Sequence, residues 1–113
     1  MKYFGFALAD GMFEEAGDCI INRRAMEAKE VKAIEGELIP CLNPSHVATI
    51  NAMHERFGIE VAIPDIPPRV SVKSGDSVIV MGVRGLPRLT DRHEYTDEEI
   101  ASASFSFSSY TVE

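Results

Sequence analysis

The chain has 113 residues, 45% of them apolar and 26% charged, which is typical of one small globular domain spanning residues 1–113 and excludes a disordered segment. Its 18 acidic residues outnumber its 11 lysines and arginines, so the net charge is -7 and the molecule repels a long nucleic acid. A small anionic ligand in a locally basic cleft remains compatible with this charge, because charges more than ~8 Å apart are screened.

The chain has two cysteines, and neither stands in a CxxC pair. Cys19 and Cys41 both have apolar neighbours, which predicts two buried thiols in a reducing compartment. The apolar runs are shorter than the ~20 residues that span a bilayer, and the N-terminus lacks the basic region of a signal peptide. We therefore expect no membrane association and a cytoplasmic location.

The first part of the chain predicts short strands around one helix. Tyr3–Leu8 is an aromatic-rich strand candidate, and Cys19–Ile21 is a second, shorter one. Ala25–Ile34 consists of good helix formers and predicts an amphipathic helix. Leu38–Leu42 reads as a strand, and its Pro40 restricts that strand to a sheet edge.

The clearest helix signal lies between residues 44 and 57. Either Asn43 or Ser45 can serve as its N-cap, and Gly58 is placed to end it. The spacing of its apolar residues predicts a buried stripe made of Val47, Ile50, Met53 and Phe57.

The second half of the chain predicts a strand-rich region. A proline-rich stretch at 63–68 is a stiff connection, and the segments 69–73 and 77–83 form a hairpin whose second strand is central in the sheet. Residues 84–95 form a basic loop, a short helix begins at the N-cap Thr96, and Ser104–Val112 is the last strand. We predict an α/β fold with one domain and a central mixed sheet of about five strands flanked by helices.

The three histidines do not form a metal-binding pattern. His46 and His54 share the long helix, but no carboxylate stands at a matching offset, so we expect no metal. The chain also lacks a nucleophile elbow and a glycine-rich phosphate loop. His46 lies in the first helical turn, where free backbone N–H groups attract a phosphate. The alternative is that His46 is a half-exposed residue at a helix cap with no ligand.

The segment 45–58 resembles the hallmark of the viral ring nucleases, a family of anti-CRISPR proteins of archaeal and bacterial viruses that has cellular relatives. The hallmark is Gly-His-x-x-Thr followed by a leucine-rich helix and a glycine, and His46 and Thr49 stand at the matching positions. The segment 69–80 is similar to the family's hairpin, and the segment 95–100 to its short acidic helix.

The resemblance implies a homodimer that binds a cyclic oligoadenylate, cyclic tetra-adenylate, and cuts this second messenger of type III CRISPR defence to linear products. No metal or other cofactor is needed. The ribose 2′-OH attacks the adjacent phosphorus in line, a 2′,3′-cyclic phosphate forms, and a histidine, here His46, protonates the departing 5′-oxygen. A viral gene product of this family would act in the host cytoplasm.

The resemblance also implies ligand contacts from three segments. In the family an arginine precedes a Leu-Pro pair, whereas Gly85 stands there in this chain, so Arg84, Arg88 or Arg92 is expected to bind phosphate. The implied ligand-binding residues are Ser45 and Thr49 at the helix start, Ala7, Leu8 and Ala9 in the first loop, and Arg84, Gly85, Leu86 and Arg88 in the basic loop.

Two other functions stay open at this point. One is a protein that sequesters a cyclic nucleotide without cleaving it, which the apolar first loop favours. The other is a small viral interaction protein without a nucleotide ligand. The presence of His46 at the helix start favours the nuclease over the sequestering protein.

Overall fold

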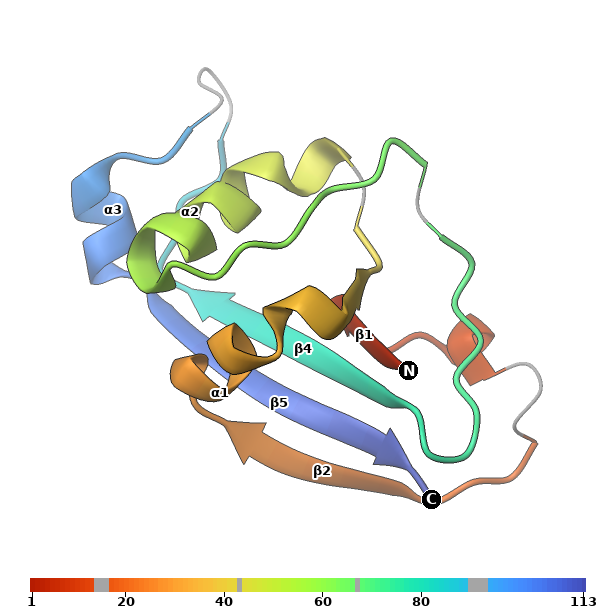
Figure 1. Cartoon of the computed structure of the whole chain (residues 1–113). Coiled ribbons are helices and arrows are strands. Elements are labelled where there is room, and N and C mark those ends of the chain that lie inside the picture. The colour runs from red at the N-terminus through yellow and green to blue at the C-terminus, as the bar shows by residue number, and fades with distance from the viewer. Residues whose placement is uncertain (14–16, 43, 67, 90–93) are drawn as a thin grey trace.

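Five strands form one mixed sheet in the order β2-β5-β4-β1-β3, which confirms the predicted α/β class (Figure 1). The structure is a computed structural model, and it describes all residues except 14–16, 43, 67 and 90–93. β1 pairs in parallel with both β3 and β4, and β5 runs antiparallel between β4 and β2. The strands are β1 (Lys2–Gly5), β2 (Ile21–Met26), β3 (Leu38–Pro40), β4 (Ser77–Arg84) and β5 (Ser104–Val112).

Two of the helices cover one face of this sheet. α1 and α2 lie in front of the strands in Figure 1, and α3 lies at the end of β4 and β5. The α-helices are α1 (Ala28–Ala33), α2 (Val47–Phe57) and α3 (Asp97–Ser102), and the 3-10 turns are η1 (Asp10–Phe13), η2 (Glu35–Glu37) and η3 (Pro44–His46). Among the described residues, no helix has the length and apolar character required to cross a membrane.

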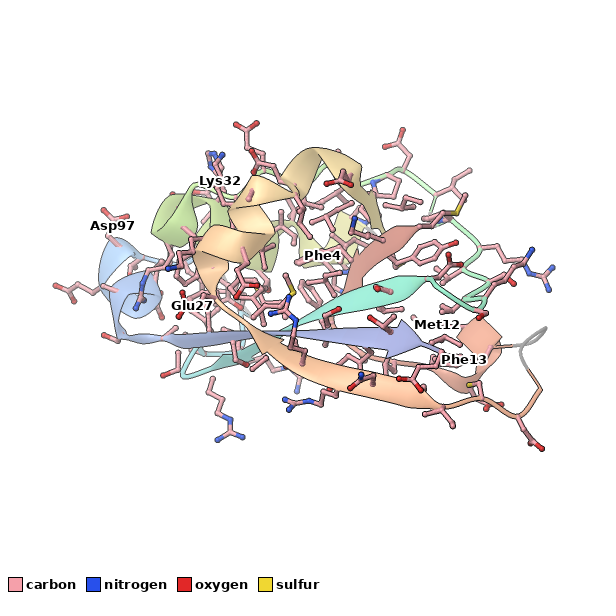
Figure 2. All side chains as sticks on the ribbon, turned by 60° about the horizontal axis from the view of Figure 1, so that its bottom comes forward. Phe4, Met12, Phe13, Glu27, Lys32 and Asp97 are labelled. Atoms are coloured by element: carbon pink, nitrogen blue, oxygen red, sulfur yellow. The ribbon has the colours of Figure 1, made fainter. Side chains whose placement is uncertain are left out.

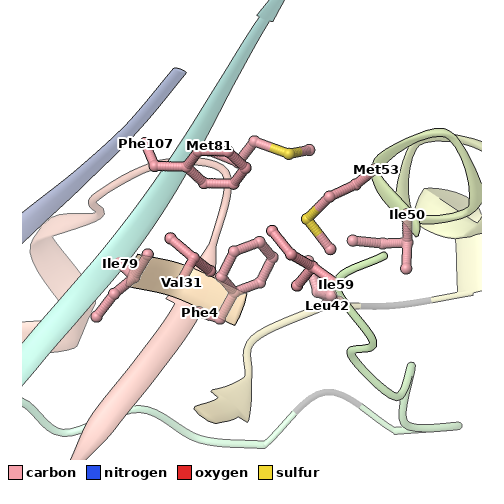
Figure 3. Packing of buried hydrophobic residues seen from close by; sticks show 9 residues of the cluster. All are labelled: Phe4, Val31, Leu42, Ile50, Met53, Ile59, Ile79, Met81 and Phe107. Carbon is pink, nitrogen blue, oxygen red and sulfur yellow. The ribbon is translucent and has the colours of Figure 1, made fainter. Parts of the chain in front are cut away.

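The main core lies between the helices and the sheet. Residues of α1, α2 and the strands interlock there (Figure 3), and the cluster consists of Phe4, Val31, Leu42, Ile50, Met53, Ile59, Ile79, Met81 and Phe107. Because successive strand residues point to opposite faces, Tyr3 and Val78 form a second cluster on the other face. Met12 and Phe13 of η1 cover that cluster, and Figure 2 labels both on the side of the strands away from α1.

α2 begins and ends close to the predicted positions. Gly58 adopts the left-handed conformation that suits glycine, with φ of 71°, and its N–H donates to the carbonyl of His54 at 2.7 Å. The predicted stripe is wrong at Val47, which is 45% exposed, whereas Ile50 and Met53 are buried. Val47 is the first residue of α2 and directly follows the turn η3.

The predicted hairpin before β4 is wrong. Residues 69–73 form no strand, and they cross the second face of the sheet as extended chain. The N–H of Val72 donates to the carbonyl of Met12 at 2.7 Å, and its side chain is completely buried. The alternating pattern therefore serves to bury Val72 against the sheet, and β4 pairs with β1 and β5, which confirms its central position.

The boundary between the second strand and the first helix is also wrong. β2 begins where the predicted strand ends, and its pairing with β5 reaches Met26↔Phe107, inside the predicted helix. Strand pairing overrides the helix propensity of these residues, so α1 begins at Ala28, after Glu27, which forms a capping box with Glu30. Cys19 precedes β2 and is exposed, contrary to the prediction of a buried thiol.

The remaining elements agree with the sequence except that the predicted strands Tyr3–Leu8 and Leu38–Leu42 are too long, because β1 ends at Gly5 and β3 at Pro40, where their pairing ends. β3 is an edge strand, as Pro40 requires, and Thr96 caps α3 by accepting a hydrogen bond from the N–H of Glu99. The segment 63–68 carries no helix or strand among its described residues.

Candidate functional site

The carboxyl ends of the three parallel strands meet at one edge of the sheet. β1 ends at Gly5 and β3 at Pro40, while β4 continues past its last pair with β1, at Val80, to Arg84. In open α/β sheets, ligands bind at this edge, in the crevice outside the strand ends. The segments that follow the three strands are therefore the place to look for a site.

His46 lies at this edge, at the N-cap position of α2. Its ring packs edge-on against the ring of Phe6, the first residue after β1, with centroids 4.7 Å apart and planes at 77°. Phe6 in turn packs edge-on against the buried Phe4, with centroids 6.5 Å apart. His46 is partly exposed, so its imidazole is oriented by the core through two aromatic rings and still reaches solvent.

Ser45 and Thr49 lie on either side of His46. Ser45 belongs to the turn η3 and is exposed, and Thr49 is half-buried in the first turn of α2. The observed N-cap residue is His46 rather than the predicted Ser45, and the alternative, Asn43, lies outside the described residues. The structure thus brings the three predicted residues of the helix start together.

The first loop supplies few side-chain contacts to this edge. Ala7 and Ala9 are exposed and offer only methyl and backbone groups, and the carbonyl of Ala9 accepts a hydrogen bond from Met12 at 3.0 Å. Leu8 packs against the cluster of Tyr3 and Val72 on the second face of the sheet. The side chain of Leu8 therefore takes part in packing.

The predicted residues after β4 divide into two groups. Arg84 is the last residue of β4 and pairs with Ser104, and strand alternation places it on the face of Val78 and Val80, opposite α2. Within one chain, Arg84 and His46 therefore lie on opposite sides of the sheet. Leu86 is half-buried and Arg88 is exposed in the segment that follows, while Arg92 lies outside the described residues.

Gly85 links this segment to the end of α3. Its φ of 89° lies in the left-handed region, and an added Cβ would stand 3.6 Å from Cα of Ala103. A larger residue would be strained there, so this glycine sets the direction in which the chain leaves β4.

Two clefts flank α2 beyond its first turn, and His54 lines both. The smaller has a volume of about 160 Å³ and lies between α2 and Tyr95, while the larger, of about 490 Å³, includes Glu60. Nε2 of His54 is 3.5 Å from the Glu60 carboxylate. The sequence analysis gave these residues no role, although Ala48, Asn51, Ala52 and Glu55 recur at the helical spacing that marks one face.

The site edge also contains a thiol. Cys41 is half-buried, its N–H donates to the carbonyl of Phe4 at 2.7 Å, and burial raises the pKa of its thiol. This environment favours the uncharged form, so Cys41 is a packing residue rather than a nucleophile. Among the residues that the structure describes, no group of three or more His, Cys, Asp or Glu side chains is arranged to hold a metal ion.

No protein-family model matches the chain, and no curated protein matches it by sequence. Among solved structures, the chain is similar to B116 of Sulfolobus turreted icosahedral virus, with a TM-score of 0.66, 19% sequence identity and coverage of 97% of both chains. The chain therefore shares the fold of a small protein from an archaeal virus over nearly its whole length.

Proposed function

We propose that this protein is a metal-independent ring nuclease that cleaves a cyclic oligoadenylate, such as cyclic tetra-adenylate, and so counters type III CRISPR defence. The observation that carries the proposal is the position of His46, at the N-cap of α2 with its ring against Phe6 and at the carboxyl edge of the parallel strands. The fold shared with a protein of an archaeal virus supports a viral origin and action in the host cytoplasm.

The chemistry needs one general acid and good positioning. N–H groups in the first turn of a helix have no partner within the helix and can donate to a phosphate, which the positive end of the helix dipole also attracts. The ligand supplies its own nucleophile, the ribose 2′-OH, which loses its proton to water as it attacks the adjacent phosphorus. The O2′–P bond forms and gives a 2′,3′-cyclic phosphate, the P–O5′ bond breaks, and a protonated His46 donates its proton to the departing 5′-oxygen. In-line positioning and one general acid together supply the acceleration.

Arg88 is the described arginine that we propose to bind a ligand phosphate. It is exposed in the segment beyond the carboxyl end of β4, whereas Arg84 lies on the sheet face opposite α2. In the homodimer that we propose, the two copies of His46 and Arg88 surround one cyclic ligand. Arg88→Gln is therefore expected to weaken ligand binding more than Arg84→Gln, as measured by the retention of radiolabelled cyclic tetra-adenylate.

The test compares two histidines of the same helix. Wild type, His46→Ala, His46→Gln and His54→Ala are incubated in EDTA with cyclic oligoadenylates of several ring sizes, and linear products are resolved by chromatography. Loss of the general acid is expected to slow cleavage by about a hundredfold to ten-thousandfold in both His46 variants. His54→Ala, on a later turn of α2, retains the wild-type rate.

Each outcome assigns one of the candidate functions. If wild type and His46→Ala both retain intact ligand in stoichiometric amounts, the protein sequesters the messenger. The methyl groups of Ala7 and Ala9, which stand in place of polar side chains, would favour this function. If no cyclic oligoadenylate binds, the nucleotide function is wrong and the interaction protein is favoured. Melting temperatures of the four proteins establish that the His46 variants are folded.

A further inference from the structure

A third cleft lies on the helix side of the sheet, near the amino-terminal end of β1 and away from His46. It has a volume of about 490 Å³, within the range of small-molecule sites. Residues of β1, β2, α1, β4 and β5 line it, among them Lys2 and Ser77 at the first positions of β1 and β4. The cleft is therefore formed by five elements that converge.

The cleft exists because α1 is too short to cover the sheet. α1 has six residues, or about 9 Å of helix, whereas β5 has nine residues, or about 30 Å of strand. In Figure 1, α1 crosses β4 and β5, and no helix lies in front of the part of β5 that leads to the C-terminus. This part of the helix-facing surface is the wall of the cleft.

The wall carries hydroxyl groups where the rest of the same face is apolar. Along β5 the core residue Phe107 is followed on its face by Ser109 and Thr111, and Ser77 of β4 pairs with Thr111. The hydroxyl oxygens of Ser77 and Thr111 are 2.9 Å apart. Hydroxyl groups contribute little to a packed core, but they can donate to and accept from a ligand.

Apolar side chains form another part of the lining. Met26 and Ile34 are half-buried and pack against the main core beside the fully buried Ile79. A ligand with an apolar body can therefore bury carbon atoms on Met26 and Ile34 while its polar atoms meet the hydroxyl groups.

Two cations stand at the rim. Nζ of Lys2 is 3.0 Å from the Glu37 carboxylate, and Nη1 of Arg24 is 2.9 Å from the Glu30 carboxylate. All four side chains are exposed, and such surface ion pairs contribute about 0–1 kcal/mol each, so an anionic ligand can compete with the carboxylates. A guanidinium has five N–H donors in a planar fork, which suits a carboxylate or a phosphate.

We propose that this cleft binds a small organic anion, a carboxylate or a phosphate monoester, whose apolar body contacts Met26 and Ile34 and whose anionic group binds Arg24. Lys2 adds a second positive charge at the rim. The site is separate from the proposed nuclease site, and its ligand need not be a cyclic nucleotide.

The test uses phenyl phosphate and benzoate as probes, with benzyl alcohol and inorganic phosphate as the apolar and anionic controls. Methyl and amide NMR spectra of the full chain are recorded during titration. Saturable shifts at the Ile34 methyl groups and the Ser109 amide are expected with phenyl phosphate or benzoate. Whichever of the two binds more tightly identifies the anionic group, and neither control reproduces the shifts.

Neighbouring arginines of β2 provide a matched pair of variants. Arg24→Gln is expected to weaken probe binding about tenfold, whereas Arg23→Gln, which removes the same charge from the opposite face of the strand, leaves it within twofold. Absence of saturable shifts in the cleft, shifts equally strong with inorganic phosphate, or equal weakening in both variants would overturn the proposal. Cleavage of cyclic tetra-adenylate is measured on the same variants, and it stays at the wild-type rate whether or not the cleft binds the probes.

Discussion

Single side chains connect the core of this protein to its surface chemistry. The ring of Phe6 lies between the buried Phe4 and the partly exposed His46, so ring packing from the core contributes to the orientation of the imidazole. Met1 and Asp76 provide a second example, because they join the start of β1 to the turn before β4. The contacts of Phe6 with His46 and of Met1 with Asp76 link residues that are distant in the sequence, so a substitution in either pair has an effect that can be predicted.

Asp76 is expected to contribute stability that depends on pH. One of its oxygens is 2.9 Å from the amino group of Met1, and the other accepts the N–H of Lys73 at 3.1 Å. The amino group of Met1 beside Asp76 lowers the pKa of that carboxyl below its ordinary value. A lowered folded-state pKa means that the stabilisation is present above the unfolded-state pKa, near 4, and is lost as the pH falls through the folded-state value.

Asp76→Asn is therefore expected to lower the free energy of unfolding by about 1 kcal/mol at pH 7. The difference from wild type shrinks as the pH falls below about 4, because the wild-type carboxyl is then protonated. Urea unfolding followed by circular dichroism at several pH values measures this. Asp65→Asn, at an exposed position, serves as the control and is expected to leave the free energy of unfolding unchanged at every pH measured. A loss of unfolding free energy in Asp76→Asn that does not vary with pH would contradict the prediction.

At the scale of the elements, α2 and α3 hold the site edge in place. α2 packs on the sheet through one face, and its Arg56 side chain donates hydrogen bonds to the end of α3, whose Ile100 is buried. Nη1 of Arg56 is 2.7 Å from the carbonyl oxygen of Ile100 and 3.1 Å from those of Ala101 and Ala103, at the carboxyl end of α3. Its guanidinium also stacks near the ring of Phe105, 5.8 Å from the centroid.

Met53 and Val47 differ in burial, and replacing each by alanine tests which side of α2 contributes the packing energy of the helix. Met53→Ala removes a completely buried side chain and is expected to cost about 2–5 kcal/mol of unfolding free energy. Val47→Ala, at a position that is 45% exposed, is expected to cost less than about 0.5 kcal/mol. Denaturant unfolding of both variants measures the costs, and similar losses would place Val47 in the core as the helical spacing alone suggests.

Arg56→Met is expected to lower the free energy of unfolding by about 2 kcal/mol, because charge-assisted hydrogen bonds to three carbonyls are lost. Amide exchange in α3 is expected to become faster than in β4, because the attachment of α3 is local. Lys29→Met is the matched control, since Lys29 pairs only with the exposed Glu27 among the interactions described. Uniform acceleration of exchange over the whole chain would mean that Arg56 acts on global stability instead.

At the scale of the whole molecule, charge and fold together define which ligands suit the protein. The net charge of -7 disfavours any long polyanion, but the cyclic ligand that we propose has four phosphates and would meet mainly the local field at the start of α2. The sheet has helices on one face and η1 with the segment 69–73 on part of the other. The edge with His46 and the cleft beside α1 are thus separate places on one small domain.

A single-stranded RNA of about 30 nucleotides is expected not to bind measurably at physiological salt, whereas cyclic tetra-adenylate binds under the same conditions. Fluorescence anisotropy of labelled ligands compares the two at several salt concentrations. Tight RNA binding would contradict this expectation. If the logarithm of its association constant falls linearly with the logarithm of salt concentration, the protein has a surface that binds a row of phosphates.

The elements that the sequence by itself determined are those with local signals. The glycine at 58 ends α2, the threonine at 96 caps α3, and the continuous apolar run from Val78 makes β4 a central strand. These features depend on residues within one turn or one strand, so short-range propensity suffices to predict them.

The tertiary structure alone decided which segments pair and which face each side chain occupies. β2 takes residues with helix propensity because β5 offers it a partner, and residues 69–73 fail to form a strand because β1 and β5 already occupy both edges of β4. The exposure of Val47 and the position of Arg84 opposite His46 also depend on how the elements are arranged in space. Strand pairing and burial depend on partners far along the chain, and a local pattern contains no information about where those partners lie.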